Sequence, residues 1–148
     1  MHKLIARIWR IIRGPMQWRV LWLWHAKYMV GVTGIVRDDA GRVLLLRHRM
    51  WPEGRQWGLP TGYASKGEEF GATVVREVKE ETGLDVKAGA LVHLKSGYKL
   101  RVEVAYEAAY VGGTIHTDSF EILEAQWFSP DQLPEGMQES HKTLILGG

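Results

Sequence analysis

The feature that most constrains this 148-residue chain is an acidic amphipathic helix predicted over residues 69–82, with Gly83 well placed to end it. At about 100° per residue, Glu77, Glu80 and Glu81 fall on one arc of this helix. The neighbouring arc is apolar and carries Phe70, Val74, Val75 and Val78. One side of the helix is therefore expected to pack on a core while the adjacent side holds three carboxylates.

These three carboxylates repel one another. Like charges four residues apart destabilise a helix by roughly 0.2–0.5 kcal/mol, and the helix dipole also disfavours Glu80 and Glu81 in the last turn. Arg76 can pair with Glu80 but cannot neutralise the whole cluster. Clustered carboxylates suit Mg²⁺ or Mn²⁺, which keep water ligands for a phosphate-bearing substrate. A solvated acidic helix end is the simpler interpretation of such a cluster.

The segment around this helix resembles the Nudix box. That box is a glycine, five residues, Glu, seven residues, then Arg-Glu-apolar-x-Glu-Glu-x-Gly-apolar. Its specified places are filled by Gly62, Glu68, Arg76, Glu77, Val78, Glu80, Glu81, Gly83 and Leu84. The resemblance covers about residues 29–135. Thr61 departs from the family pattern, which most often has a second glycine there, although Gly62 can still supply an unusual backbone angle.

The resemblance implies an α/β (α+β) fold, a Nudix-like α/β/α sandwich with a mixed sheet. It implies Glu77, Glu80 and Glu81 as metal ligands, with Glu77 also able to act as the base. Arg76 would hold the glutamates in place, and Glu68 would contribute to metal binding from the loop side. The implied reaction is Mg²⁺- or Mn²⁺-dependent hydrolysis of a diphosphate linkage in a nucleoside diphosphate derivative, with ADP-ribose or a nucleotide sugar slightly favoured. A nucleoside triphosphate substrate and a non-catalytic nucleotide-binding module are the alternatives.

Further site residues are predicted less directly. Many enzymes of this family use another acid before the last framework strand, where Asp118, Glu121 and Glu124 are available. Glu121 is favoured as the additional catalytic residue. Substrate contacts are predicted at basic, aromatic and loop positions, namely Arg47, Arg49, Arg55, Trp57, Tyr63 and Gly62, with Trp51 as a further aromatic candidate. Solvated arginines and core aromatics are the competing interpretation.

The rest of the body, residues 29–148, is predicted to be one mixed α/β domain with mostly hairpin-connected strands. Strands are predicted at 29–36, 43–49, 57–60, 85–95, 101–111 and 121–128. A short helical turn is expected at Ser129-Pro130, and a last helix at 139–146.

Residues 1–28 are predicted to form a basic amphipathic arm. A helix over residues 3–13 would gather its apolar side chains on one side, namely Leu4, Ile5, Ile8, Trp9, Ile11 and Ile12, before Gly14-Pro15 breaks it. Residues 1–37 contain seven Lys/Arg and no acid, whereas residues 38–148 contain 12 Lys/Arg and 17 acids, a net charge of −5. Arginines interrupt the apolar stretches, so we expect no transmembrane span.

The arm is expected to pack on the domain or on a second subunit, as a homodimer, because apolar helix faces are usually buried against protein. Peripheral membrane contact, with a lipid-linked diphosphate as substrate, is the alternative and is not favoured. The body has no predicted basic face, so no nucleic-acid partner is expected. The chain has no cysteine, which excludes disulfides and Cys-type zinc sites. We expect a cytoplasmic location.

Overall fold

The computed structural model describes residues 2–12, 14–117 and 120–147. These residues form helices and strands of a mixed α+β fold. The helices are α1 (His2–Ile11), α2 (Pro15–Trp24), α3 (Phe70–Thr82) and α4 (Glu139–Leu146). The strands are β1 (Met29–Arg37), β2 (Val43–His48), β3 (Trp57–Gly58), β4 (Thr61–Tyr63), β5 (Asp85–Tyr98), β6 (Arg101–Gly112) and β7 (Ile122–Phe128).

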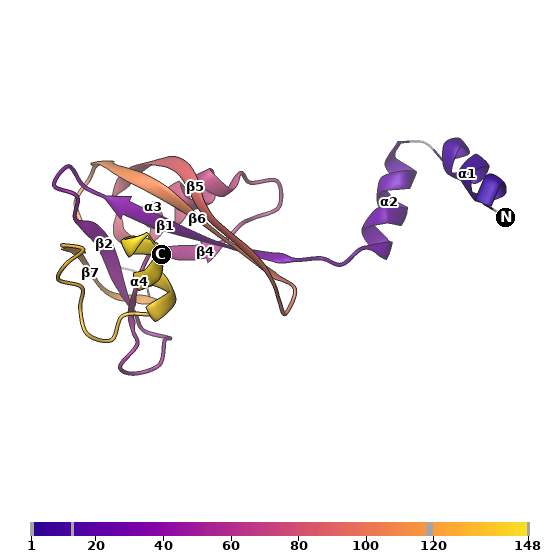
Figure 1. The fold of residues 1–148 in the computed structure, drawn as a ribbon. Coiled ribbons are helices and arrows are strands. Elements are labelled where there is room, and N and C mark those ends of the chain that lie inside the picture. Colours follow the sequence, from indigo (N-terminus) through magenta and orange to yellow (C-terminus); the bar gives the residue numbers. More distant parts are fainter. Residues whose placement is uncertain (1, 13, 118–119, 148) are drawn as a thin grey trace.

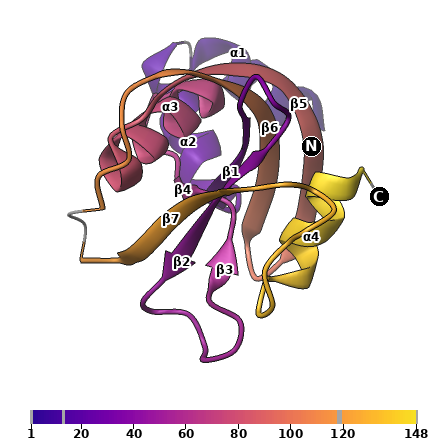
Figure 2. The ribbon, with the colours of Figure 1, turned by 90° about the vertical axis from the view of Figure 1, so that its left-hand side faces the viewer.

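The strands of the described residues form one mixed sheet in the order β3-β2-β1-β6-β5, with β4 paired to β1 and β7 paired to β2. β1 runs parallel to β6, with Val32 opposite Val104, and antiparallel to β2 and β4. A parallel pair needs a crossover connection, and here the connecting segment contains α3. Figure 2 shows α3 and α4 on opposite sides of the sheet.

Alternate residues of the central strands build two cores, one on each face of the sheet. Val36 and Leu44 are buried with Val74 of α3 on one face. Ile35 and Leu45 are buried with the C-terminal part of α4 on the other face. The fold is therefore the predicted layered sandwich, with α3 held against the sheet by its apolar side and its acidic side left at the edge.

Most predicted elements match the structure within a few residues. The predicted helix over 69–82 is α3, and Gly83 ends it in the left-handed region with φ 74°. The predicted turn after β7 is a single hydrogen-bonded turn, in which Gln132 N–H donates to Ser129 O at 2.9 Å. The predicted strand over 57–60 is wrong in extent, because β3 ends at Gly58 and β4 spans Thr61–Tyr63. β4 forms by pairing with β1, a contact distant in sequence that local patterning does not reveal.

The N-terminal helices lie beyond the sheet. Figure 1 shows α1 and α2 at one end of the molecule, joined to β1 by an extended segment. The predicted helix over 3–13 corresponds to α1, which ends at Ile11, and residue 13 lies outside the described residues. Among the helices described, none has both the length and the apolar character needed to cross a membrane.

Candidate active site

Arg76 of α3 connects the acidic side chains of the site. Its guanidinium donates to Glu68 at 2.8 and 3.0 Å, to Glu77 Oε1 at 2.8 Å and to Glu80 Oε2 at 3.3 Å. It also donates to the backbone oxygen of Tyr63 at 3.2 Å. One cation thus holds three carboxylates and ties α3 to β4, which is the position that the predicted role of Arg76 requires.

Both carboxylate oxygens of Glu68 accept hydrogen bonds from other residues of the chain. Besides Arg76, its Oε2 accepts hydrogen bonds from the Ser65 N–H and the Thr73 hydroxyl, both at 2.9 Å. The hydrogen bonds from Arg76, followed by the one from the Ser65 N–H, lower the pKa of Glu68 to about 2. Glu68 does not line the cavity that contains Glu77, Glu80 and Glu81. Its geometry makes it an anchor for Arg76, while its predicted role as a metal ligand stays a prediction.

Gly62 of β4 lies directly against Glu77. A Cβ at residue 62 would stand 2.0 Å from Glu77 Cδ and 2.1 Å from its Oε1, a distance that no side chain can occupy. Gly62 is not among the glycines with positive φ, so the expectation of an unusual backbone angle there is wrong. The glycine is needed for space, because the carboxylate of Glu77 occupies the volume of a side chain.

Glu81 is buried with an unsatisfied carboxylate oxygen. The residue is 7% exposed, and its Oε2 has no hydrogen-bond partner in the described part of the chain. Burial, followed by the charges of Glu77, Glu121 and Glu80, raises the pKa of Glu81 to about 8. A buried, unpaired carboxylate surrounded by other acids is the environment that a bound cation would stabilise.

The acidic side chains that this structure describes are not arranged as a complete set of metal ligands. Among the described residues, no three His, Asp or Glu side chains are arranged to hold a metal ion. The ion pairs of Arg76 with Glu77 and Glu80 are part of the reason, because both carboxylates are directed toward the guanidinium. The residues nevertheless fit a hard divalent cation in two respects: the donors are carboxylate oxygens, and Glu81 Oε2 lacks a partner.

A cavity of about 760 Å³ opens over these acids. Its walls include Gly62, Tyr63, Glu77, Glu80, Glu81 and Glu121. Glu121, the favoured additional acid, therefore lines the same cavity as the acids of α3, and its charge contributes to the raised pKa of Glu81. Glu124 does not line this cavity and instead pairs with Arg47 at 3.5 Å, and Asp118 lies outside the described residues.

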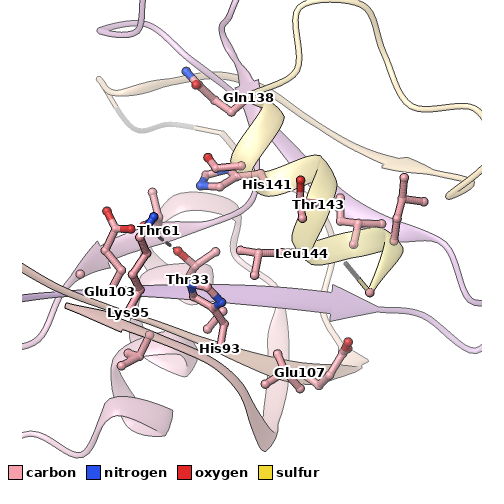
Figure 3. Close-up of a pocket in the computed structure, with 18 of the residues that line it drawn as sticks. Thr33, Thr61, His93, Lys95, Glu103, Glu107, Gln138, His141, Thr143 and Leu144 are labelled. Atoms are coloured by element: carbon pink, nitrogen blue, oxygen red, sulfur yellow. Dashed lines mark hydrogen bonds between the residues drawn. The ribbon is translucent and has the colours of Figure 1, made fainter. Parts of the chain in front are cut away.

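A second cavity of about 660 Å³ lies between the sheet and α4. Figure 3 shows this cavity, with His141 and Leu144 of α4 facing Thr33 and His93 of the sheet. Both cavities are lined by Trp51, Thr61 and Arg101, so they adjoin. Thr61, which departs from the Nudix box, contributes a hydroxyl here that donates to Val32 O at 3.2 Å and contacts the Thr33 hydroxyl at 3.2 Å.

The predicted substrate contacts divide into two groups. Tyr63 and Gly62 line the acidic cavity, whereas Arg47, Arg49, Arg55 and Trp57 line neither of the two cavities. Arg49 donates to the Phe120 backbone oxygen at 2.8 Å, and Trp57 packs edge-on against Phe128 in the core beneath α4. Arg55 is exposed in the loop before β3.

Sequence reasoning missed Arg101 and His48. Arg101 of β6 donates to the Tyr63 hydroxyl at 3.0 Å and lies over the Tyr63 ring. His48 stacks on Trp51 with ring centroids 3.8 Å apart, and its Nε2 is buried without a hydrogen-bond partner among the described atoms. Burial lowers the pKa of His48 to about 4, so the ring is neutral at pH 7. No local pattern marks either residue, because strand pairing alone brings them to the cavity.

Comparison with known proteins gives a consistent result. The family model described as the NUDIX domain matches residues 27–146. The chain is 35% identical over 101 residues to the NAD-capped RNA hydrolase NudC of Vibrio atlanticus (strain LGP32), covering 68% of this chain and 37% of that protein. It is 31% identical over 117 residues to the nucleoside diphosphate-linked moiety X motif 6 of Xenopus laevis, covering 74% of this chain and 54% of that protein.

The fold is also shared with solved structures. The ADP-ribose pyrophosphatase of Streptococcus suis 89-1591 superposes with a TM-score of 0.65 at 26% identity, covering 80% of this chain and 90% of that one. The chain spans only about a third to a half of the length of the two curated relatives above. The match nevertheless includes the whole acidic segment from Gly62 to Leu84, and on this evidence the chain belongs to the Nudix family.

Proposed function

We propose that this protein hydrolyses a diphosphate linkage in a nucleoside diphosphate derivative, such as ADP-ribose or a nucleotide sugar, with Mg²⁺ or Mn²⁺. The observation that carries the proposal is the buried carboxylate of Glu81, whose Oε2 lacks a partner in a cavity lined by three further glutamates. An unpaired buried carboxylate is costly in free energy. A divalent cation would remove that cost, which explains why the chain keeps such a cluster.

The acidic residues of the cavity have different proposed roles, in metal binding and in proton transfer. Glu80 and Glu81, together with Glu77, would supply carboxylate oxygens to the cation, and Glu121 would face them across the cavity. The cation, when bound, lowers the pKa of water and neutralises charge on the diphosphate oxygens. Glu77 would accept the proton of the attacking water, and its carboxylate, held at the cavity wall by Arg76 and by the absence of a side chain at Gly62, supports this role.

The adjoining cavity supports a diphosphate derivative as the substrate. A substrate with its diphosphate over the acids can extend past Trp51 and Arg101 into the space beneath α4. Glu103 and Glu107 line that space, where they pair with Arg101 and Arg37 of the same lining, and carboxylates and guanidinium groups both form hydrogen bonds with hydroxyl groups. A ribose or sugar, which presents several hydroxyl groups, suits this mixture of donors and acceptors. The likeness to an ADP-ribose pyrophosphatase structure agrees with this choice.

A panel of substrates tests the proposal. The full chain is incubated with Mg²⁺ or Mn²⁺ and ADP-ribose, UDP-glucose, NADH or dGTP, and the products are identified by mass. We expect two monophosphates from ADP-ribose or from the sugar nucleotide. Release of pyrophosphate from dGTP would instead support the triphosphate alternative. Tight binding of a nucleotide without turnover of any compound would support the non-catalytic module.

Matched variants connect turnover to the acidic cavity. Glu81→Gln keeps the size of the side chain and removes its charge, so turnover of every substrate should be lost. Lys87→Gln removes a charge from the exposed outer part of β5, and it should leave the rate unchanged. Equal rates for wild type and Glu81→Gln would show that the hydrolysis arises elsewhere or from a contaminant.

A further inference from the structure

The two N-terminal helices expose apolar side chains along their length. On α1, Leu4, Ile5 and Ile11 are 58–73% exposed, and on α2, Trp18 and Trp24 are 74% and 86% exposed. Exposed apolar surface that continues over two helices is a mark of an interaction site. The sequence favours protein as its partner, but the structure leaves this surface uncovered by the domain.

The charged side of α1 is wholly basic. It carries Lys3, Arg7 and Arg10, all exposed, and residues 1–37 contain no acid. A helix with Ile and Trp on one side and Lys and Arg on the other is typical of helices that lie in a membrane interface. Such a helix is complementary in charge to anionic lipid headgroups.

α2 is apolar on nearly every side. At about 100° per residue, Met16, Val20 and Trp24 project to one side and Trp18 and Trp22 to the opposite side, and all five are exposed. A second protein surface can cover one side of such a helix, whereas acyl chains and headgroups can surround it. Its ten residues span about 15 Å, too short to cross a bilayer but suited to the interface, where tryptophan is enriched.

The tip of the β5–β6 hairpin continues this surface onto the domain. Met29, the first residue of β1, donates its N–H to Leu100 O at 2.9 Å, so the tip lies beside the junction with the arm. Figure 1 shows the hairpin end directed to the same side of the molecule as α2. The tip adds the exposed side chains of Lys99 and Leu100, and Leu94 of β5 is exposed as well, so this surface is again apolar and basic.

We propose that α1, α2 and the tip of the β5–β6 hairpin bind an anionic lipid surface. The basic side of α1 would face the headgroups, and the tryptophans of α2 would enter the interface. Residues 38–148, with their net charge of −5, would be kept away from the same surface by repulsion. A second copy of the chain is the competing partner, but two arms packed together would still leave one side of each α2 uncovered.

Vesicle binding by the full chain tests this proposal. The protein is mixed with vesicles of phosphatidylcholine alone or of phosphatidylcholine with phosphatidylglycerol, and the vesicles are sedimented at low and high salt. We expect binding to the anionic vesicles and a clear weakening with added salt. The triple variant Lys3→Gln, Arg7→Gln, Arg10→Gln should bind roughly 100-fold more weakly, because each basic side chain near an anionic surface contributes about fivefold.

Two controls identify the contact surface. Lys66→Gln, Lys87→Gln, Lys142→Gln removes the same charge from exposed positions of the domain and should leave vesicle binding unchanged. Brominated lipids should quench the tryptophan fluorescence of the bound protein, and a chain with Trp9, Trp18, Trp22 and Trp24 replaced by Phe should lose most of that quenching.

Three results would overturn the proposal. The first is absence of binding to anionic vesicles, and the second is equal binding by the wild type and the arm triple variant. The third is a stable dimer by light scattering that stays dimeric in the arm triple variant and does not sediment with either kind of vesicle, which would identify a second copy as the partner.

Discussion

The carboxylate of Glu77 lies where the side chain of residue 62 would be, 2.0 Å from the position of a Cβ on Gly62. This contact joins the first glycine of the acidic segment to its central glutamate across the gap between β4 and α3. Arg76 holds the same carboxylate from the other side at 2.8 Å. The position of the Glu77 carboxylate therefore depends on the space left by glycine at residue 62 and on the ion pair with Arg76.

Gly62→Ala should displace Glu77 and reduce turnover about 100-fold, since a misplacement of about 1 Å can cost that much in rate. Stability should fall by about 1–3 kcal/mol, the usual cost of overpacking. Steady-state kinetics and urea denaturation measure the two effects. Gly112→Ala is the matched control, because a Cβ there meets nothing within 4 Å. Normal activity in Gly62→Ala would contradict the importance of this contact.

Glu81→Gln should stabilise the metal-free protein by about 1–3 kcal/mol at pH 8, the range for relieving an unsatisfied buried group. The pKa of Glu81 is raised from 4.5 to about 8, so its contribution to stability is complete below pH 4.5 and is lost as the pH rises toward 8. Denaturation in EDTA across this range should show that loss in the wild type and a flatter profile in the variant. Adding Mn²⁺ at pH 8 should stabilise the wild type alone.

Glu121→Gln should lower kcat about tenfold or more, the lower end of the effect of losing an acid or base. Glu124→Gln should stay within about twofold of the wild type, because Glu124 pairs with Arg47 outside the acidic cavity. Initial rates at saturating substrate and metal compare the two variants directly. The opposite ranking would assign the additional acid to Glu124.

His48 and His141 should make the protein sensitive to acid. Burial lowers the pKa of both rings from 6.5 to about 4, so stability is complete above pH 6.5 and is lost as the pH falls toward 4. The loss is on the order of 3 kcal/mol or less for each ring. His48→Phe keeps the stacking on Trp51 and should remove about half of the loss between pH 7 and 4.5, measured by urea denaturation. The exposed His116→Asn should keep the full loss; an unchanged slope in His48→Phe would contradict the assignment.

The amino-acid sequence by itself determined the local elements of the site. The apolar and acidic arcs of residues 70–82 require a helix that packs on one side, and Gly83 ends it because only a residue tolerant of the left-handed region fits there. The spacing of Glu77, Glu80 and Glu81 follows from helical geometry alone. The alternation of residues 102–110 predicted β6, because a strand half-buried in a sheet must alternate. The hairpin turn at residues 38–41 marked the segments on either side of it as β1 and β2, and all three strands were predicted within a residue or so.

Only the tertiary structure decided which residues share the cavities. β1 pairs with β4 on one side and with β6 on the other, and this pairing brings Arg101 onto Tyr63, 38 positions earlier in the chain. The packing of α3 on the sheet likewise decides two features of the site. It buries Glu81 and leaves its Oε2 unpaired, and it brings Glu77 so close to residue 62 that only glycine fits there. Local sequence patterns encode periodicity and turn chemistry, whereas the pairing of distant strands depends on the packing free energy of the whole domain.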